Sequence, residues 1–203
     1  MRWLLFMWLH ACSGPATAEV PTVEAPAPKV GQAEAIFAGG CFWCMEGPFD
    51  KVPGVMETWS GYTGGPELGP TYRQVAGHKT GHVEALRVVY DPTKVDYATL
   101  LQVFWHNIDP TQDDGQFCDR GAQYRSAIFV SDPDLKQQAL ATKKVVQQQL
   151  GTRVVTEIRP VAPFWVAEEM HQDFYQKQPA HYYRYRKGCG RDARLKALWG
   201  SKE

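Results

Sequence analysis

The chain has no excess charge of either sign and no hydrophobic run near its start long enough to cross a membrane. Its 22 basic and 22 acidic residues balance, so no strong net field draws it to nucleic acid or to an anionic membrane surface. The apolar segment from Trp3 to Leu9 is far too short to span a bilayer. These absences favour a substrate that is a small molecule or a peptide.

The sequence also has no internal repeat and no sign of a second domain. With 203 residues, 44% of them hydrophobic, it is long enough for one well-buried core. Its cysteines do not form a zinc pattern, because Cys118 and Cys189 stand alone and no histidine pair has zinc-finger spacing. We therefore expect no bound metal and no nucleic-acid partner.

The first part of the chain has the composition of an export signal followed by a linker. A basic start, a short apolar run and the small residues Ala16 to Ala18 are typical of a secretory signal peptide over residues 1–18. Leu9 to Cys12 loosely resembles a lipoprotein cleavage site, which would end the signal at residue 11 and leave Cys12 lipidated. Prolines make residues 19–31 a semi-extended tether. We expect periplasmic or cell-envelope localisation, with or without a lipid anchor.

Residues 32–203 alternate strand-like and helical segments in a mixed order. Strands are expected at 35–38, 56–62, 82–90, 125–130 and 152–161. Helices are expected from Cys41 onward and at 96–107, 132–150 and 166–176, with a loop at 186–190 before a final helical turn. Hairpin-like neighbours favour one α+β domain, a two-layer sandwich on a mixed and largely antiparallel sheet.

The most informative segment is Gly39 to Cys44, where a thiol follows a buried strand and two turn-forming glycines. Cys41 falls in the first turn of a helix, whose free N–H groups and dipole favour an anion and lower the pKa of a thiol. We therefore interpret Cys41 as a nucleophilic or redox-active cysteine. Cys44 completes a Cys-x-x-Cys pair, so a thioredoxin-like disulfide oxidoreductase that uses both thiols is the alternative function.

Four further polar residues lie in segments that could meet this thiol. They are Tyr62, Glu84, Asp119 and Tyr124. Taken singly, the tyrosines could be rim residues and Asp119 a turn residue. Glu84 is harder to dismiss, because a carboxyl within an apolar strand is partly desolvated, which raises its pKa toward the range of a general acid.

Six motifs follow one another along the chain. They are Gly40 to Trp43, Gly61 to Gly65, Pro70 to Tyr72, Thr80 to Ala85, Phe104 to Pro110 and Asp119 to Ser126. In this order and spacing they resemble the A-type peptide-methionine sulfoxide reductase family, over roughly Ala33 to Trp199. The resemblance implies reduction of the S-sulfoxide of methionine, free or in oxidised proteins, to methionine.

The resemblance also implies a role for each candidate residue. These roles are attack on sulfur by Cys41, proton donation by Glu84, binding of the sulfoxide oxygen by Tyr62 and Tyr124, orientation by Asp119, and an apolar cap for the S-methyl group by Phe42 and Trp43. Methionine then leaves, and Cys41 remains as a sulfenic acid.

A second thiol must next form a disulfide with Cys41, and the sequence leaves the choice open. Cys189 is preferred, because family members commonly resolve from a glycine-flanked C-terminal segment of this kind. Cys44 replaces the glycine often found after the Gly-Cys-Phe-Trp motif and can close locally, whereas Cys118 is expected to have no special role. We expect no bound cofactor, a thioredoxin-like or other dithiol reductant as electron donor, and a monomer.

Overall fold

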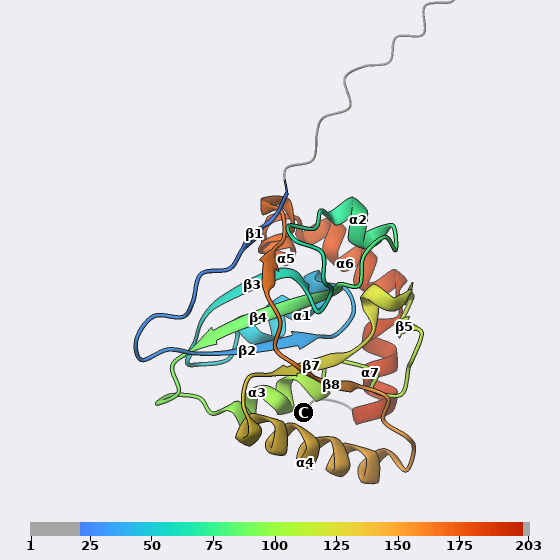
Figure 1. Cartoon of the computed structure of the whole chain (residues 1–203). Coiled ribbons are helices and arrows are strands. Elements are labelled where there is room, and N and C mark those ends of the chain that lie inside the picture. The colour runs from blue at the N-terminus through green and yellow to red at the C-terminus, as the bar shows by residue number, and fades with distance from the viewer. Residues whose placement is uncertain (1–20, 201–203) are drawn as a thin grey trace, which may run out of the picture.

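A sheet of seven strands forms the centre of the computed structural model, which describes residues 21–200. The expected signal peptide and Cys12 lie outside the described residues. The strand order is β1-β9-β3-β4-β2-β7-β8, and all neighbours run antiparallel except β7 and β8 (Figure 1). This mixed, largely antiparallel sheet with its helices confirms the expected α+β fold. No helix within the described range is both long and apolar enough to cross a membrane.

The strands are β1 (Val23–Glu24), β2 (Ala33–Ala38), β3 (Val55–Thr63), β4 (Val83–Tyr90), β5 (Gly115–Gln116), β6 (Asp119–Arg120), β7 (Ala127–Val130), β8 (Glu157–Pro160) and β9 (Phe164–Val166). The helices are α1 (Phe42–Asp50), α2 (Tyr72–Ala76), α3 (Tyr97–Trp105), α4 (Pro133–Leu150), α5 (Phe174–Lys177), α6 (Pro179–Gly188) and α7 (Arg191–Trp199), with 3-10 turns η1 (Ala122–Tyr124) and η2 (Glu169–His171).

Local start and stop signals explain why several elements match the sequence predictions. The Asp96 side chain accepts a hydrogen bond from the backbone N–H of Thr99 at 2.8 Å and caps α3. Asp132 caps α4 in the same way, followed by a proline in the first turn. Gly151 ends α4 in the left-handed conformation, with φ 63°.

Helices α1, α3 and α4 cover one face of the sheet and form the main core with it. Phe37 of β2 is fully buried there and stacks on Phe49 of α1 and Phe104 of α3, with ring centres 5.2 and 5.1 Å apart. The opposite face carries a smaller cluster that includes Ile36, Phe129 and Phe164. Since β2 and α1 are both held in the main core, the turn between them has fixed ends.

The expected tether is partly built into the fold. Val23 and Glu24 form strand β1 and pair with β9 at the sheet edge. The Thr22 hydroxyl donates a hydrogen bond to the Pro70 carbonyl at 2.7 Å, and Arg87 donates to the Pro26 carbonyl at 2.7 Å. Proline-rich composition did not reveal this, because β1 is an edge strand whose pairing partner β9 lies about 140 residues away in the chain.

The C-terminal part differs most from the sequence predictions. The expected helix at 166–176 is instead the end of strand β9, a 3-10 turn and the short helix α5. The expected loop at 186–190 is the end of α6, a sharp bend at Gly190 with φ 67°, and the start of α7. Cys189 caps α6, and its backbone N–H is bonded to the Tyr185 carbonyl. It therefore lies on a defined helix end rather than in a flexible tail.

Candidate active site

Cys41 lies at the turn that joins β2 to α1, as the strand–glycine–helix pattern predicted. Gly40 has φ 82°, and a side-chain Cβ at this position would lie 2.5 Å from the Cβ of buried Gln116. Only glycine fits this turn without displacing its neighbours. Cys41 is the N-cap residue of α1 and is 7% exposed, so its sulfur sits at the helix start but almost out of water.

Cys41 and Cys44 are both free thiols, and their side chains are hydrogen-bonded to one another. Burial raises the pKa of Cys41 well above its usual value. The hydrogen bond from Cys41, with the nearby charges of Arg191 and Arg186, lowers the pKa of Cys44 to about 6. These influences favour the thiolate on Cys44 over Cys41, and burial opposes the lowering of the Cys41 pKa that the helix start was expected to cause.

Glu84 lies on β4, directly opposite Tyr62 of β3 in the sheet register. It is 2% exposed, and its Oε2 accepts a hydrogen bond from the backbone N–H of Phe42 at 3.1 Å. Burial raises the pKa of Glu84 to about 8. The carboxyl is thus neutral at pH 7, and its proton lies beside the residue that follows Cys41, as expected for an acid in an apolar strand.

Three tyrosines surround the Cys41 thiol and the Glu84 carboxyl: Tyr72, Tyr124 and Tyr185. Burial raises the pKa of each, and the proximity of the acidic groups of Glu84 and Cys41 raises the pKa values of Tyr72 and Tyr124 further. The Tyr185 hydroxyl donates a hydrogen bond to the Asp119 carboxylate and lies close to the Cys41 side chain. These hydroxyls are neutral donors, and 37% exposure of Tyr72 leaves the site open on its side.

Tyr62 is not part of this open group. It is fully buried, and its hydroxyl donates a hydrogen bond to Glu168 Oε2 at 2.8 Å. The other carboxylate oxygen of Glu168 accepts from the backbone N–H of Tyr72, also at 2.8 Å. Tyr62 therefore supports the start of helix α2, and Tyr72 occupies the position facing Cys41 that the sequence analysis gave to Tyr62.

The two aromatic residues after Cys41 have different environments. Phe42 is buried, 5.2 Å from His171 and 5.9 Å from Tyr62 between ring centres. Trp43 is half-buried, stacks on Phe174 with ring centres 3.7 Å apart, and donates its indole N–H to His171 Nδ1 at 3.1 Å. Trp43 is thus a fixed apolar wall at the rim, and Phe42 supports it from inside.

Asp119 lies on β6 and connects the thiol pair to a disulfide. Its carboxylate accepts the Tyr185 hydroxyl, and burial raises its pKa. Cys118 and Cys189 form a disulfide with Cα atoms 4.9 Å apart, and their sulfurs lie within 4.8 Å of an Asp119 carboxylate oxygen. The expectation that Cys118 has no special role is wrong, because it is the partner of Cys189.

Sequence reasoning missed four residues of this arrangement: Tyr72, Glu168, His171 and Tyr185. Tyr72 lies in the quoted Pro70 to Tyr72 motif, so that motif was the available signal. The other three come from the C-terminal segments whose elements were predicted incorrectly. Their contacts span more than 60 residues of sequence, and no local pattern marks them.

Comparison with known proteins gives one consistent result. A family profile described as peptide methionine sulfoxide reductase matches residues 33–203. A relative from Caulobacter vibrioides named peptide methionine sulfoxide reductase MsrA 2 is 48% identical over 184 residues, covering 90% of this chain and 91% of the relative.

Solved structures agree with the sequence relatives. Methionine sulfoxide reductase A of Corynebacterium diphtheriae is 31% identical, with a TM-score of 0.68 over 81% of this chain and 92% of that one. The reduced form of Mxr1 from Saccharomyces cerevisiae is 29% identical, with a TM-score of 0.71 over 75% and 90%. The chain therefore belongs to the peptide methionine sulfoxide reductase family and is an oxidoreductase that reduces methionine sulfoxide through its thiols.

Proposed function

We propose that the site around Cys41 reduces the S-sulfoxide of methionine by the residues described above. The observation that carries this proposal is the buried carboxyl of Glu84, which accepts a hydrogen bond from the backbone N–H of Phe42 next to the two buried free cysteines. A sulfoxide sulfur becomes electrophilic when its oxygen is protonated or strongly hydrogen-bonded. The site supplies an acid, hydroxyl donors and a sulfur nucleophile together.

The first step transfers the sulfoxide oxygen to the enzyme. Cys41 attacks the sulfoxide sulfur while its proton passes to the Cys44 thiolate, which is already hydrogen-bonded to it. Glu84 protonates the oxygen from Oε1, since Oε2 is engaged with the Phe42 N–H. The sulfur–oxygen bond of the substrate breaks, methionine leaves, and Cys41 becomes a sulfenic acid.

Hydroxyl donors and an apolar wall orient the substrate. Tyr72 and Tyr124 hold the sulfoxide oxygen, and Tyr185 with Asp119 orients the Cys41 sulfur. Trp43 lies against the S-methyl group, with Phe42 as its inner support. Opposite placement of polar and apolar groups makes the pocket chiral, which suits one sulfoxide epimer.

Resolution proceeds through two cysteine pairs. Cys44 is the nearest thiol to Cys41, so it forms the first disulfide, in place of the expected Cys189. The dithiol of Cys118 and Cys189 then reduces the Cys41–Cys44 disulfide and becomes oxidised itself. A dithiol reductant reopens the Cys118–Cys189 bond from outside, where Cys118 is exposed.

A thioredoxin-type protein is the proposed donor, and the envelope the proposed location. Yeast Mxr1, which is similar to this chain, has also been solved in complex with Trx2, which supports a thioredoxin-type donor.

The composition of residues 1–18 supports export, with Cys12 as the candidate site of lipidation. Since all proposed groups come from one chain, the protein would work as a monomer without a bound cofactor.

Turnover of the two sulfoxide epimers tests the substrate assignment. We expect reduction of methionine S-sulfoxide and little reduction of the R epimer, because only one epimer places its oxygen at the tyrosines and its methyl group at Trp43. Methionine formation with a dithiol reductant is the measurement. Equal rates for both epimers would contradict the proposed pocket.

Replacement of Glu84 tests the acid. Glu84→Gln should slow release of the first methionine by about 10²- to 10⁴-fold, and Cys41→Ser should abolish it. Because the neutral carboxyl is the active form and its pKa is raised to about 8, the single-turnover rate should fall as pH rises through about 8. A Glu84→Gln variant that keeps this alkaline limb would show that another group is the acid.

Three tyrosine variants distinguish the residues that bind the sulfoxide oxygen from the residue that supports helix α2. Tyr72→Phe and Tyr124→Phe should each lower the single-turnover rate, since each removes one donor to the sulfoxide oxygen. Tyr62→Phe should chiefly lower thermal stability, because its hydroxyl donates to Glu168 and not to the open site. Single-turnover rates and unfolding temperatures of all three variants are compared. A rate loss confined to Tyr62→Phe would restore the role first given to that residue.

Mass spectrometry of intermediates tests the order of disulfides. After one equivalent of sulfoxide, enzyme reduced beforehand at all cysteines should show Cys41 joined to Cys44 before a Cys118–Cys189 bond appears. Cys44→Ser should accumulate the Cys41 sulfenic acid, and Cys189→Ser should form the inner disulfide but recycle slowly. Early linkage of Cys41 to Cys189 would support the original choice of resolving cysteine instead.

A further inference from the structure

Arg191 is a buried arginine at the start of α7, two residues after Cys189. It is 1% exposed. One terminal nitrogen donates to the Asn107 carbonyl at 2.6 Å and to the Gly39 carbonyl at 3.2 Å, and lies 3.2 Å from Met45 Sδ. The guanidinium carbon lies 4.3 Å from the centre of the Phe117 ring. The side chain thus reaches back to the turn that presents the thiol pair.

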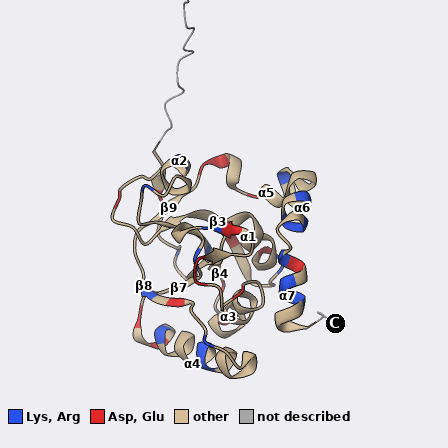
Figure 2. Cartoon of the chain, turned by 90° about the vertical axis from the view of Figure 1, so that its right-hand side faces the viewer, with Lys and Arg blue, Asp and Glu red and all other residues tan. Residues whose placement is uncertain are grey.

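This guanidinium has no carboxylate partner within 4.0 Å among residues 21–200. Its Nε is also buried without a hydrogen-bond partner. By contrast, Arg186 pairs with Asp192 at 2.5 Å, and Arg194 pairs with Asp109 at 2.7 Å (basic residues on α6 and α7 are blue in Figure 2). Burying a charge without a counter-ion is costly, so an anion close to Arg191 is required.

The turn that carries the thiol pair lies next to this guanidinium. Met45, in contact with the guanidinium, directly follows Cys44 on α1, and a Cβ built on Gly40 would lie 3.8 Å from the other terminal nitrogen of Arg191. After the hydrogen bond from Cys41, the charge of Arg191 is the largest influence that lowers the pKa of Cys44. The charge of Arg191 also acts to lower the pKa of Asp119, but the Asp119 carboxylate already accepts a hydrogen bond from the Tyr185 hydroxyl.

We propose that Arg191 is the counter-ion of the Cys44 thiolate and a positioning residue for formation of the Cys41–Cys44 disulfide. The inference rests on the proposed function, in which Cys41 becomes a sulfenic acid. Cys44 attacks the Cys41 sulfur, a sulfur–sulfur bond forms, and the sulfur–oxygen bond breaks. The departing hydroxide leaves as water with the proton that Cys44 had received from Cys41. Arg191 stabilises the thiolate that forms as Cys44 gives up this proton for the attack.

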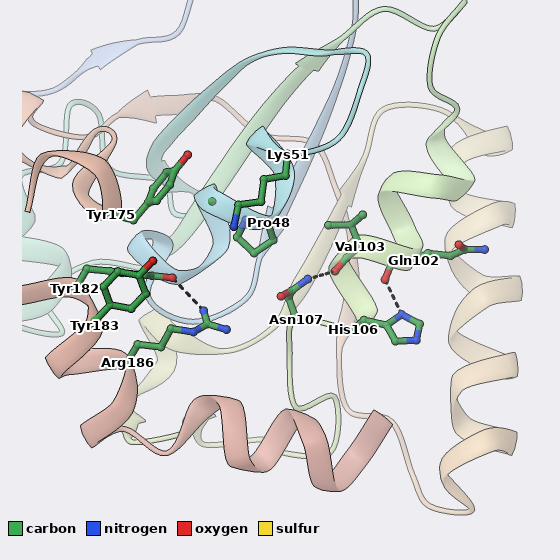
Figure 3. A pocket seen from close by; sticks show the side chains of 11 residues that line it. Pro48, Lys51, Gln102, Val103, His106, Asn107, Tyr175, Tyr182, Tyr183 and Arg186 are labelled. Carbon is green, nitrogen blue, oxygen red and sulfur yellow. Dashed lines mark hydrogen bonds between the residues drawn. The ribbon is translucent and has the colours of Figure 1, made fainter. Parts of the chain in front are cut away.

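Other groups also face Cys44 from the elements packed around it. The titratable and charged ones are Cys41, Glu84, Asp119, Tyr182, Tyr185 and Arg186. Arg186 is the only other cation in this set. It donates to the Tyr182 hydroxyl and lines a cavity of about 550 Å³ between α1, α3 and α6 (Figure 3). Its charge is balanced by Asp192, so Arg191 carries the uncompensated charge.

The pH dependence of Cys44 alkylation tests the proposal. The sample is the full-length enzyme with the Cys118–Cys189 disulfide intact. Iodoacetamide labelling of Cys44 is followed by mass spectrometry from about pH 4.5 to about pH 9.5. This range covers the expected midpoint and the ordinary pKa range of a thiol. We expect a wild-type midpoint well below the ordinary thiol value of about 8.5. Arg191→Met should raise this midpoint by at least about one pH unit, which lowers labelling on the acidic side about tenfold.

Controls distinguish charge from structure. Arg191→Lys keeps the charge and should restore most of the low midpoint, whereas Arg194→Met, one turn further on α7, should leave it unchanged. A merely structural effect of Arg191→Met would change the labelling rate at every pH without moving the midpoint, and this result would overturn the proposal. If Arg191→Met does not fold, a wild-type midpoint at or above about 8.5 would overturn it equally.

Failure of the proposed function would look different. Release of the first methionine from wild-type enzyme tests Cys41 and Glu84 and does not depend on the labelling midpoint. No methionine release would reject the proposed chemistry, whereas release with an unmoved Cys44 midpoint in folded Arg191→Met would reject only the role of Arg191.

Discussion

Burial of two thiols and a carboxyl around one turn ties their ionisation states together. Little water reaches this turn to stabilise separate charges, so each ionised group needs a partner of opposite charge or a hydrogen-bond donor. Glu84 meets this constraint by remaining neutral, and Cys41 by donating its proton toward Cys44. In the proposed mechanism the negative charge starts on Cys44, and the buried guanidinium of Arg191 contacts the same turn through Gly39 and Met45. Glu84 can act as an acid and Cys44 as a base in one site, because burial raises the pKa of Glu84 while the hydrogen bond from Cys41 lowers the pKa of Cys44.

The fold holds this group from three sides. The β2–α1 turn fixes the cysteines, and the register of β3 with β4 places Glu84 opposite Tyr62. The segment after β9 closes the third side, where Glu168 receives both the Tyr62 hydroxyl and the Tyr72 N–H. Tyr62 is therefore necessary for the geometry although it does not face the substrate. The buried hydrogen bond from Tyr62 to Glu168 holds the start of α2, and with it Tyr72, in one position.

Local chemistry in the sequence was enough for the elements with clear ends, such as α3 with its Asp96 cap and α4 between Asp132 and Gly151. It also singled out Cys41 and Glu84 as candidates, because a thiol after two glycines and an acid in an apolar strand are unusual within a few residues. Tyr62 and Tyr72 could not be ranked this way. Both follow turn-forming residues, and only the long-range hydrogen bond to Glu168 shows which hydroxyl is already occupied.

The position of Cys189 was predicted incorrectly for a similar reason, and the correction changes how electrons from the reductant would reach the site. Glycines on both sides suggested a mobile tail, but the segment is a capped helix end tied to Cys118. A buried inner pair is poorly reached by a protein reductant, whereas the outer disulfide has an exposed cysteine at the surface. Asp119 and Tyr185 bridge the two pairs. Separating them lets the inner pair stay dry for sulfoxide chemistry while the outer pair meets its donor.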